Sequence, residues 1–391
     1  MGKMHLIATS AFGIEAVVSR ELQKLGYTDQ YVENGKVTFS GDERAICKAN
    51  LWLRTADRVL LKMGEFQALS FEELFEKTKA LPWEQWIPED GEFLVEGKSV
   101  DSKLFSISDC QAIVKKAIVE RLKQKYKCEW FKETGPRYRV EVSLLKDMAT
   151  LTIDTSGSGL HKRGYRKLVG GAPLKETMAS ALILISRWKS DRALFDPFCG
   201  SGTIPIEAAM IGLDMAPGLQ REFDAENWPN IPKSLWAEVR KEAREMIKFD
   251  RELKIQGTDI SEDAISLARY HAKKAGVDKY IHIQRMPMSE IRSKEKYGFI
   301  ICNPPYGERL GQMKEIEKLY REMGTVFSTL DTWSYYILTS HPGFEKLFGK
   351  KANKKRKLYN GRILCNYYQF YGPPPPKKPM LKDNLGMQEN L

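Results

Sequence analysis

The stretch DPFCGSGT at residues 196–203 decides the fold. It follows a short apolar strand and leads into residues 203–211, whose apolar side chains have helical spacing. Gly200 and Gly202 permit a tight turn between strand and helix and a close approach of a ligand to the backbone. Because open α/β sheets bind ligands at the carboxyl ends of their strands, the stretch predicts a parallel sheet with a small ligand at this turn. Pro205 stands where a dinucleotide fingerprint requires a third small residue, which argues against a pyrophosphate.

Strands and helices alternate through the C-terminal half of the chain. Further strands are expected at residues 253–259, 280–284, 299–302 and 335–339, and helices at residues 235–249, 261–276 and 316–330. This alternation predicts an α/β fold with a doubly wound parallel sheet. Residues 355–359 and 362–371 flank Asn360 and Gly361, a pair that favours a type I′ turn, so we expect an antiparallel hairpin at the edge of the sheet.

A carboxylate ends the strand at residues 253–259. There Asp259 can accept both hydrogens of a ribose diol, which predicts a nucleoside next to the glycine turn. More residues separate Gly202 from Asp259 than in a minimal dinucleotide-binding unit. The intervening segment contains the helix expected at 235–249 and can form an excursion from the domain. Taken alone, an acid at the start of a helix could instead serve the helix dipole.

The sharpest motif is NPPY at residues 303–306, directly after the apolar strand 299–302. An exocyclic amine on a nucleic-acid base is a poor nucleophile, because its lone pair is delocalised into the ring. The amide oxygen of Asn303 and the backbone carbonyl of Pro304 could accept its two N–H bonds and turn the lone pair toward an electrophile. Tyr306 offers an aromatic face on which an extruded base can stack. The motif therefore predicts attack of a base amine on an electrophile held beside it.

The N-terminal region has a different architecture. A helix is expected at residues 13–25, a strand at 93–100, a helix at 108–126 and a strand at 138–143, which together indicate a compact α+β unit. A flexible polar tail is expected at residues 373–391.

Composition narrows the partners. The 391 residues carry a net charge of +11, which favours a polyanion such as nucleic acid. The six cysteines are scattered, without metal-ligand spacing, so neither a zinc site nor a disulfide framework is expected. No apolar run is long enough to span a membrane, and a cytoplasmic protein is expected.

These motifs together resemble the class I S-adenosylmethionine-dependent methyltransferases of the THUMP-containing bacterial large-subunit rRNA guanine-N2 methyltransferase family. The likeness rests on DPFCGSGT, Asp259 and NPPYGER at residues 303–309, and on N-terminal segments that include FGIE at 12–15, RTADRVL at 54–60, LPW at 81–83 and LHKRGYR at 160–166. The resemblance implies a C-terminal Rossmann-like methyltransferase domain at residues 161–372. A ferredoxin-like domain at 1–65 and a THUMP RNA-binding domain at 66–160 would precede it.

The resemblance also implies roles for single residues. Asn303, Pro304 and Tyr306 would hold the target base. The S-adenosylmethionine (SAM) cofactor would contact Asp196, Phe198, Gly200, Gly202, Thr203, Asp259 and Ile260, with Glu207 as a weaker member that could instead pack locally. No acid follows the next strand, where the sequence reads RMPM at 285–288, so no residue is assigned to the adenine amine.

Two basic groups are candidates for phosphate contact, since such clusters gain affinity by releasing counterions. A solvated surface is the alternative for each. The predicted RNA-binding residues are Lys162, Arg163 and Arg166 in the first group, Lys354, Lys355 and Arg356 in the second, and Arg309.

The predicted function is methylation of the exocyclic N2 of a guanine in RNA, with large-subunit (23S) rRNA as the expected substrate. A tRNA guanine-N2 methyltransferase is the nearest alternative. A non-catalytic RNA-binding or ribosome-assembly protein is an alternative of another class. No metal is expected, since the cysteines and histidines lack metal-ligand spacing.

Overall fold

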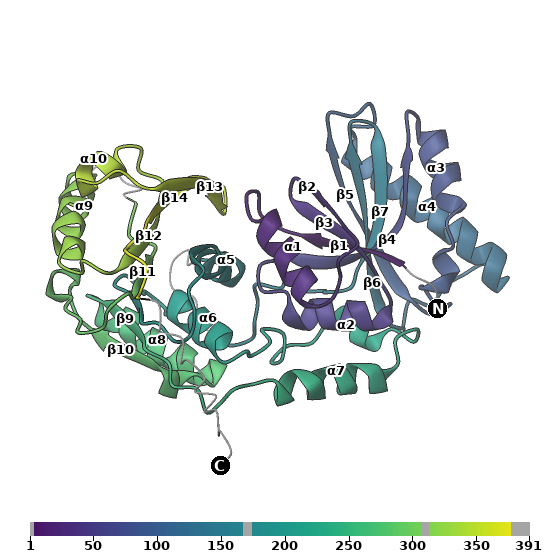
Figure 1. Ribbon diagram of the computed structural model, residues 1–391. Coiled ribbons are helices and arrows are strands. Elements are labelled where there is room, and N and C mark those ends of the chain that lie inside the picture. Colours follow the sequence, from purple (N-terminus) through teal and green to yellow (C-terminus); the bar gives the residue numbers. More distant parts are fainter. Residues whose placement is uncertain (1–3, 167–173, 307–312, 377–391) are drawn as a thin grey trace, which may run out of the picture.

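The computed structural model describes residues 4–166, 174–306 and 313–376, which form two units joined side by side (Figure 1). We call them the N-terminal unit and the C-terminal domain. Each is built around its own seven-stranded sheet.

The N-terminal unit has a sheet in the order β2-β3-β1-β4-β7-β6-β5. Its strands are β1 Met4–Thr9, β2 Gln30–Glu33, β3 Lys36–Gly41, β4 Arg58–Gln67, β5 Glu92–Val100, β6 Arg137–Leu145 and β7 Met148–Asp154. Its helices are α1 Glu15–Lys24, α2 Glu43–Trp52, α3 Phe71–Lys79 and α4 Ile107–Tyr126. The division expected at residue 65 falls inside β4, which pairs with β1 on one side and β7 on the other. One sheet therefore runs through the two expected N-terminal domains.

The C-terminal domain has the order β10-β9-β8-β11-β12-β14-β13, and its strands are parallel except for β14, which is antiparallel to both of its neighbours. Its strands are β8 Leu194–Asp196, β9 Ile255–Asp259, β10 Ile281–Arg285, β11 Phe299–Cys302, β12 Ser334–Thr339, β13 Lys354–Asn360 and β14 Ile363–Phe370. Its helices are α5 Glu176–Ser186, α6 Thr203–Gly212, α8 Glu262–Ala275, α9 Met313–Ser328 and α10 Phe344–Phe348. The parallel α/β fold predicted from the alternating pattern is confirmed.

Two apolar cores lie on the opposite faces of this second sheet. One contains buried side chains of α5, α6 and α8, such as Leu182, Ile206 and Ile265. The other contains side chains of α9 and α10, such as Tyr320 and Phe348. Helices on both faces leave the carboxyl ends of β8, β9 and β11 at one open edge, where the motifs lie.

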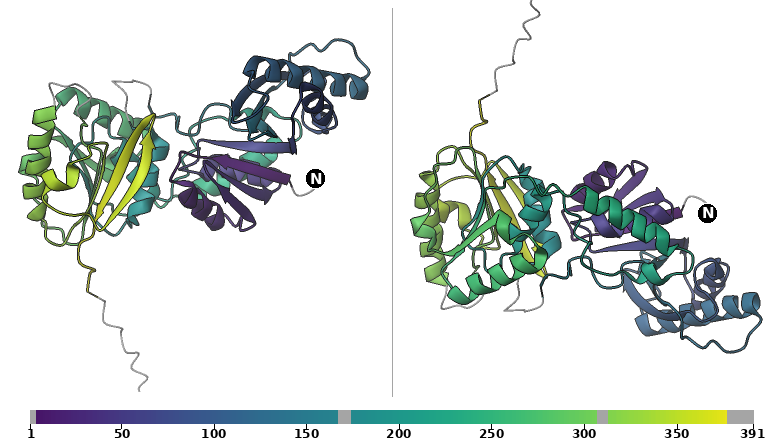
Figure 2. Two further views of the ribbon diagram at one scale, coloured as in Figure 1. Left: turned by 90° about the horizontal axis from the view of Figure 1, so that it is seen from above. Right: turned by 90° about the horizontal axis from the view of Figure 1, so that it is seen from below.

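The segment between α6 and β9 leaves the C-terminal domain and packs on the N-terminal unit. It contains α7 Lys233–Glu245, which lies beside α2 in Figure 1 and across the N-terminal unit in the right-hand view of Figure 2. Trp228 stacks on Tyr138 of β6 with ring centroids 4.8 Å apart, and Trp236 is buried in the same core. The expected excursion is confirmed, but its apolar residues complete the N-terminal core.

The edge hairpin forms as predicted, with a different turn. Asn360 pairs with Ile363, so the two-residue loop is Gly361 and Arg362. Gly361 has a φ of +63°, whereas Arg362 does not enter the left-handed region. This pattern, with glycine at the first central position, is that of a type II′ turn. The type I′ prediction centred on Asn360 was wrong by one residue.

Candidate active site

A cavity of about 780 Å³ opens at the carboxyl ends of β8, β9 and β11. Its size falls within the range of small-molecule and cofactor sites. Seven of the predicted cofactor and base-binding residues line it: Asp196, Phe198, Gly200, Thr203, Asp259, Ile260 and Asn303. Residues that lie more than 100 positions apart in the sequence therefore meet at one site.

The two glycines of the turn after β8 have different tasks. Gly200 has a φ of +50°, and a Cβ atom there would meet nothing within 4 Å, so its backbone borders open space. Gly202 has a φ of +84°, and a Cβ there would lie 3.0 Å from the Cβ of Ala268 on α8. Gly202 is not among the residues that line the cavity, so its absent side chain lets α6 and α8 pack closely.

Asp259 is held by backbone amides at the edge of the cavity. The Gly200 N–H donates to Oδ2 over 3.0 Å, and the Ser261 N–H donates to Oδ1 over 3.0 Å. A carboxylate has about four acceptor positions, so each oxygen keeps capacity for a further donor such as a hydroxyl. Beside it, the Ile260 side chain is 68% exposed and lines the same cavity. This pairing of a fixed acceptor with an apolar side chain fits a ribose and its base.

Asp196 is the buried acid of the site. It is 1% exposed, and its Oδ1 accepts a hydrogen bond from the Phe198 N–H over 3.1 Å. Burial raises the pKa of Asp196 well above its ordinary value, and the negative charge of Asp259 adds to the effect. A cationic group that enters the cavity would stabilise the ionised form of this carboxyl.

The NPPY loop places Asn303 and Pro305 in the cavity wall, while Pro304 and Tyr306 are not among the lining residues. The Tyr306 hydroxyl donates to Oδ1 of Asn303, and its ring packs against the core that contains α5. Burial raises the pKa of Tyr306 above its ordinary value. The Tyr320 hydroxyl donates to the Pro305 carbonyl over 2.8 Å and anchors the loop to α9. In this conformation, therefore, Asn303 Oδ1, which is expected to accept a hydrogen bond from a base amine, accepts one from the Tyr306 hydroxyl instead.

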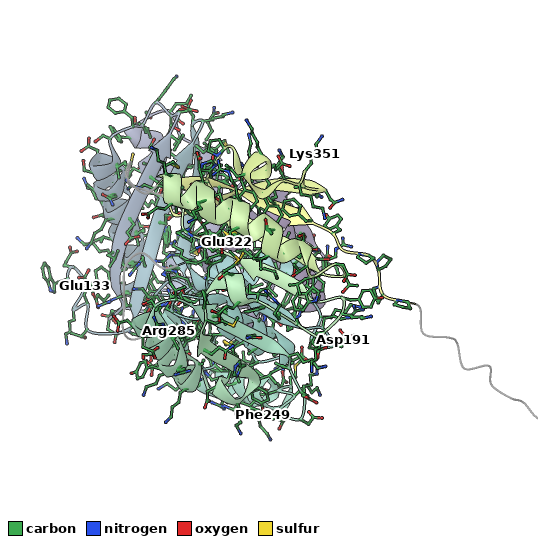
Figure 3. All side chains as sticks on the ribbon, turned by 90° about the vertical axis from the view of Figure 1, so that its left-hand side faces the viewer. Glu133, Asp191, Phe249, Arg285, Glu322 and Lys351 are labelled. Atoms are coloured by element: carbon green, nitrogen blue, oxygen red, sulfur yellow. The ribbon has the colours of Figure 1, made fainter. Side chains whose placement is uncertain are left out.

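Several lining residues lie outside every motif. They come from the start of α5, from the turn after β10 and from α9: Leu174, Met288, Ser289, Leu319 and Glu322. Figure 3 shows Glu322 on α9, on the face turned toward the viewer. Arg285, which ends β10, donates from Nε to the Ile260 carbonyl over 2.9 Å and so braces the loop after β9. A motif search cannot find such residues, because tertiary packing, such as that of α9 on the sheet, brings them to the cavity.

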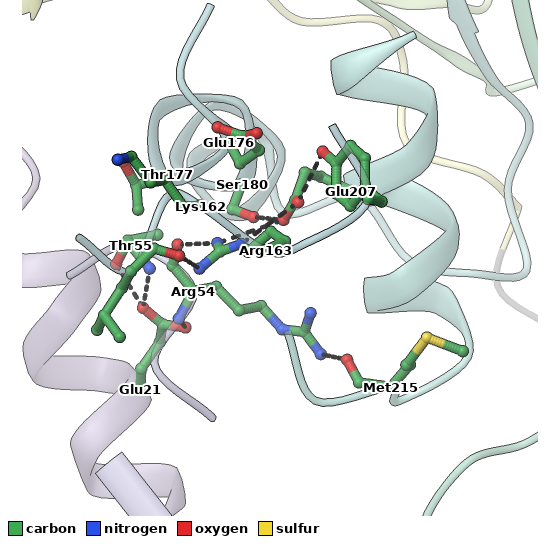
Figure 4. Close-up of polar contacts among 12 residues, drawn as sticks. Glu21, Arg54, Thr55, Lys162, Arg163, Glu176, Thr177, Ser180, Glu207 and Met215 are labelled. Atoms are coloured by element: carbon green, nitrogen blue, oxygen red, sulfur yellow. Dashed lines mark hydrogen bonds and ion pairs between the residues drawn. The ribbon is translucent and has the colours of Figure 1, made fainter. Parts of the chain in front are cut away.

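Glu207 belongs to a buried network, not to the cavity wall. It is fully buried and accepts hydrogen bonds from the Tyr165 hydroxyl over 3.2 Å and from the Ser180 hydroxyl over 2.5 Å (Figure 4). Arg163 forms an ion pair with it at 3.4 Å. We call Glu207, Arg163, Tyr165 and Ser180 the buried network. The weaker prediction that Glu207 contacts the cofactor is corrected, because its oxygens are committed to these partners.

Arg163 joins this network to the N-terminal unit. Its guanidinium also donates to the carbonyls of Leu160 and Arg54. Arg54 in turn donates to the Met215 carbonyl over 2.7 Å, and its own N–H donates to Glu21 of α1 over 2.9 Å. The side chain of Arg163 is 2% exposed. The expectation that Arg163 contacts RNA phosphates is therefore wrong, since its guanidinium stabilises the contact between the two units.

Arg166 also points inward. It forms an ion pair with Glu176 at 3.4 Å and donates to the Thr203 hydroxyl over 2.5 Å. Its side chain is 13% exposed and supports the cavity wall through Thr203. The prediction that Arg166 contacts RNA phosphates is therefore corrected. Its neighbour Lys162 is exposed, which leaves its amine accessible to RNA.

The second basic group lies on β13. Lys354 and Lys355 are exposed, and Lys355 forms an ion pair with Glu345 at 2.7 Å. Arg356 is half-buried and donates to the Gly13 carbonyl over 3.3 Å. Arg309 lies outside the described residues.

Within residues 4–166, 174–306 and 313–376, no group of three or more His, Cys, Asp or Glu side chains could hold a metal ion. In the same part of the chain, no helix has the length and apolar character needed to cross a membrane. All six cysteines are free thiols.

Three family descriptions match the chain. Residues 163–369 match the family described as RMKL-like, methyltransferase domain. Residues 5–60 match the RlmL ferredoxin-like domain, and residues 68–154 match the THUMP domain.

Two relatives extend over nearly the whole chain. YpsC of Bacillus subtilis (strain 168), named as a candidate RNA methyltransferase, is 52% identical, and the alignment covers 97% of this chain and 98% of YpsC. The ribosomal RNA large subunit methyltransferase K/L of Syntrophotalea carbinolica is 33% identical over 96% of this chain. This chain spans only 56% of that protein's length.

Two solved structures share the fold and about half of the sequence. A protein of Listeria monocytogenes str. 4b F2365, described as a predicted N6-adenine-specific DNA methylase, is 53% identical with a TM-score of 0.92, covering 95% of this chain and 97% of its own. SMU.472, a methyltransferase in complex with SAH, is 46% identical with a TM-score of 0.92, covering 96% of this chain and all of its own. The names of these relatives and solved structures agree on methyl transfer. Two of them name RNA as the substrate and one names DNA.

Proposed function

The chain belongs to the RMKL-like methyltransferase family and is a SAM-dependent class I methyltransferase, and from this premise we propose that it methylates the exocyclic N2 of a guanine in large-subunit rRNA. The observation that carries the proposal is the meeting of Asn303 and Asp259 in one cavity. An amide that can hold a base amine thus shares a space with a carboxylate that can hold a ribose.

The residues that line the cavity fit SAM. Asp259 would accept the ribose hydroxyls with its spare acceptor positions, and the exposed Ile260 side chain would pack on the adenine. Asp196, Phe198 and Thr203 would surround the methionine end, where Asp196 would gain a cationic partner for its buried carboxyl. When bound, SAM supplies a methyl group on an electrophilic sulfonium.

Catalysis would come from positioning the base. Asn303 Oδ1 and the Pro304 carbonyl would accept the two N–H bonds of the guanine amine, directing its lone pair toward the sulfonium side of the cavity. For this the Tyr306 hydroxyl must leave Asn303, and the freed ring could then stack on the base. No acid or base with a special pKa is required, since the amine loses its proton after attack.

RNA as the substrate is supported by independent features. The chain carries a net charge of +11 and contains a THUMP domain, and the relative from Syntrophotalea carbinolica is named for ribosomal RNA. Exposed Lys162 and Lys354 would contact phosphates, and Arg309 is proposed for the same role.

The test is methylation in vitro with radiolabelled SAM and total RNA from a strain that lacks this gene. We expect label in large rRNA, recovered as N2-methylguanosine after digestion, and a much lower initial rate of labelling with the Asn303→Ala protein. Label in tRNA would replace the proposal with a tRNA methyltransferase, and label as N6-methyladenine in DNA would replace RNA as the substrate. Absence of SAM binding in calorimetry would contradict the proposal, because the protein could then not catalyse methyl transfer.

A further inference from the structure

A second, smaller cavity lies between the N-terminal unit and the edge of the second sheet. It has a volume of about 330 Å³. Four cationic side chains line it: Arg20 of α1, Arg187 at the end of α5, and Lys354 and Arg356 of β13. Among the described residues that line it, none is Asp or Glu.

The topology explains why these charges meet. Lys354 and Arg356 are two apart on β13, so their side chains lie on the same face of the sheet. That face is covered by α5, because the Tyr367 hydroxyl of β14 donates to the Leu182 carbonyl over 2.9 Å. The cavity forms where α5 ends at Arg187, and α1 brings Arg20 from the other unit. The gathering is therefore built by the fold and not by a run of basic sequence.

The four charges lack carboxylate partners among the described residues. In the part of the chain that the structure describes, none of them forms an ion pair with a carboxylate. Like charges around one small space repel each other, and a bound anion would remove that repulsion. Nearby Lys355, in contrast, is paired with Glu345.

A buried donor in the same cavity points to a ligand independently of the charges. Gln369 of β14 lines the cavity and is 3% exposed. Its Oε1 accepts a hydrogen bond from the Tyr371 hydroxyl over 3.1 Å, but its Nε2 has no partner. Since a buried N–H without an acceptor is costly, an oxygen-rich ligand beside it would satisfy a real deficit.

We infer that this cavity, which we call the basic cavity, binds a phosphate group of the RNA substrate. Guanidinium groups and an amide N–H are the donors that suit phosphate oxygens. A phosphate bound there would contact α1 of one unit and β13 of the other, and would fix their relative position while RNA is bound. The inference rests on RNA being the substrate, but not on which base is methylated.

The experiment compares two double variants of the full chain that lose the same charge. Arg20→Gln with Arg187→Gln removes two cations from the cavity, whereas Lys24→Gln with Lys189→Gln removes exposed cations from the same helix and the same loop outside it. Affinity for deproteinised large-subunit rRNA is measured by filter binding at several KCl concentrations. We expect the cavity variant to bind about tenfold more weakly. Its log–log salt slope should fall by about one, the value for one lost phosphate contact. Equal effects of the two variants would overturn the inference.

A second arm separates an RNA phosphate from a small phosphorylated ligand. The melting temperature is measured with inorganic phosphate and with chloride at equal ionic strength. Stabilisation by phosphate in the wild type, absent from the cavity variant, together with the changed RNA slope, supports the inference. Stabilisation by phosphate with an unchanged RNA slope would assign the cavity to a free phosphate compound and overturn the RNA assignment.

Gln369→Met tests the unpartnered donor. The change removes the buried N–H and keeps a similar volume, so we expect no loss of melting temperature in chloride and a smaller gain in phosphate. A full gain in phosphate would contradict the assigned role of Gln369. SAM binding is measured in every variant, so that a failure of the methyltransferase proposal, which would show there or in the methylated nucleoside, is not confused with failure of the phosphate site.

Discussion

The cavity at the carboxyl ends of β8, β9 and β11, which we call the cofactor cavity because we propose that SAM binds there, contains the carboxylate of Asp259. The buried network contains the carboxylate of Glu207, and the two carboxylates differ in their freedom to bind a ligand. Asp259 accepts two backbone N–H groups at the rim of the cavity and keeps acceptor capacity. Glu207, one turn into α6, accepts from Tyr165 and Ser180 and forms an ion pair with Arg163. The difference shows that nearness to a motif does not make a side chain a ligand, because what matters is how many of its acceptor positions the protein already uses.

Arg163→Met should have the largest effect on folding stability, because it removes the cation of the buried network. Glu207 would remain buried without its cation, which costs about 3–5 kcal/mol of folding free energy. For a chain of 391 residues that corresponds to a fall in melting temperature of roughly 4–6 °C. Differential scanning calorimetry measures it, and Lys162→Met, the exposed neighbour, serves as the control. A variant that melts like the wild type would show that the network contributes little to stability.

Asn303→Ala should have the largest effect on the chemistry of the cavity. We expect single-turnover methylation to fall about 10²–10³-fold, the usual loss when one positioned hydrogen-bonding group is removed from an active site. SAM affinity, measured by calorimetry, should stay within about twofold, since in the proposed mechanism Asn303 contacts the base and not the cofactor. Tyr306→Phe is the matched control, because it removes the hydroxyl on Asn303 and keeps the ring. Near-normal turnover of Asn303→Ala would refute the proposed mechanism.

Asp259→Ala should separate the two carboxylates by cofactor affinity. Loss of charged hydrogen bonds worth about 1.5–3 kcal/mol corresponds to SAM binding roughly 10- to 150-fold weaker. Glu262→Gln, an exposed acid one turn along the chain, should leave the affinity unchanged. The melting temperature should move far less than in Arg163→Met. If it moved as much, Asp259 would be a structural acid like Glu207.

His161 gives the smallest expected effect, and it concerns pH. Burial and the nearby Lys175 lower the pKa of His161 from 6.5 to about 4. Between these values the unfolded chain binds a proton that the folded chain does not, so this contribution to stability is complete above pH 6.5 and is lost as the pH falls toward 4. His161→Gln should therefore flatten the fall in melting temperature between pH 7 and pH 4.5, whereas the exposed His282→Gln should not. Parallel curves for His161→Gln and wild type would contradict the assignment.

The parts that the sequence predicts well are those specified by neighbouring residues. The helix capped by Ser261 and closed by Gly276 forms as expected: Ser261 Oγ accepts the Ala264 N–H, and Gly276 has a φ of +73°. The strands that end in Asp196 and Asp259 and the strand before Asn303 are confirmed as well, because short apolar runs carry a strong local signal.

The parts that the sequence does not predict depend on distant contacts. Glu322 reaches the cofactor cavity because α9 packs over the sheet, and Arg163 is buried because Glu207 of α6 meets it there. The basic cavity combines α1, α5 and β13, which no local pattern relates to one another. A lysine and an arginine that are adjacent in the sequence, Lys162 and Arg163, therefore have opposite environments.

The excursion that carries Trp228 and Trp236 has a consequence for how the protein is made. During synthesis the whole first sheet emerges before these tryptophans, so the N-terminal core cannot close until about residue 245 has left the ribosome. A fragment that ends near residue 160 would expose the face of Tyr138 that Trp228 covers. The N-terminal unit, which contains the THUMP domain, is thus not an independent module that can be cut off and grafted elsewhere, because its last apolar residues are encoded within the C-terminal half of the chain.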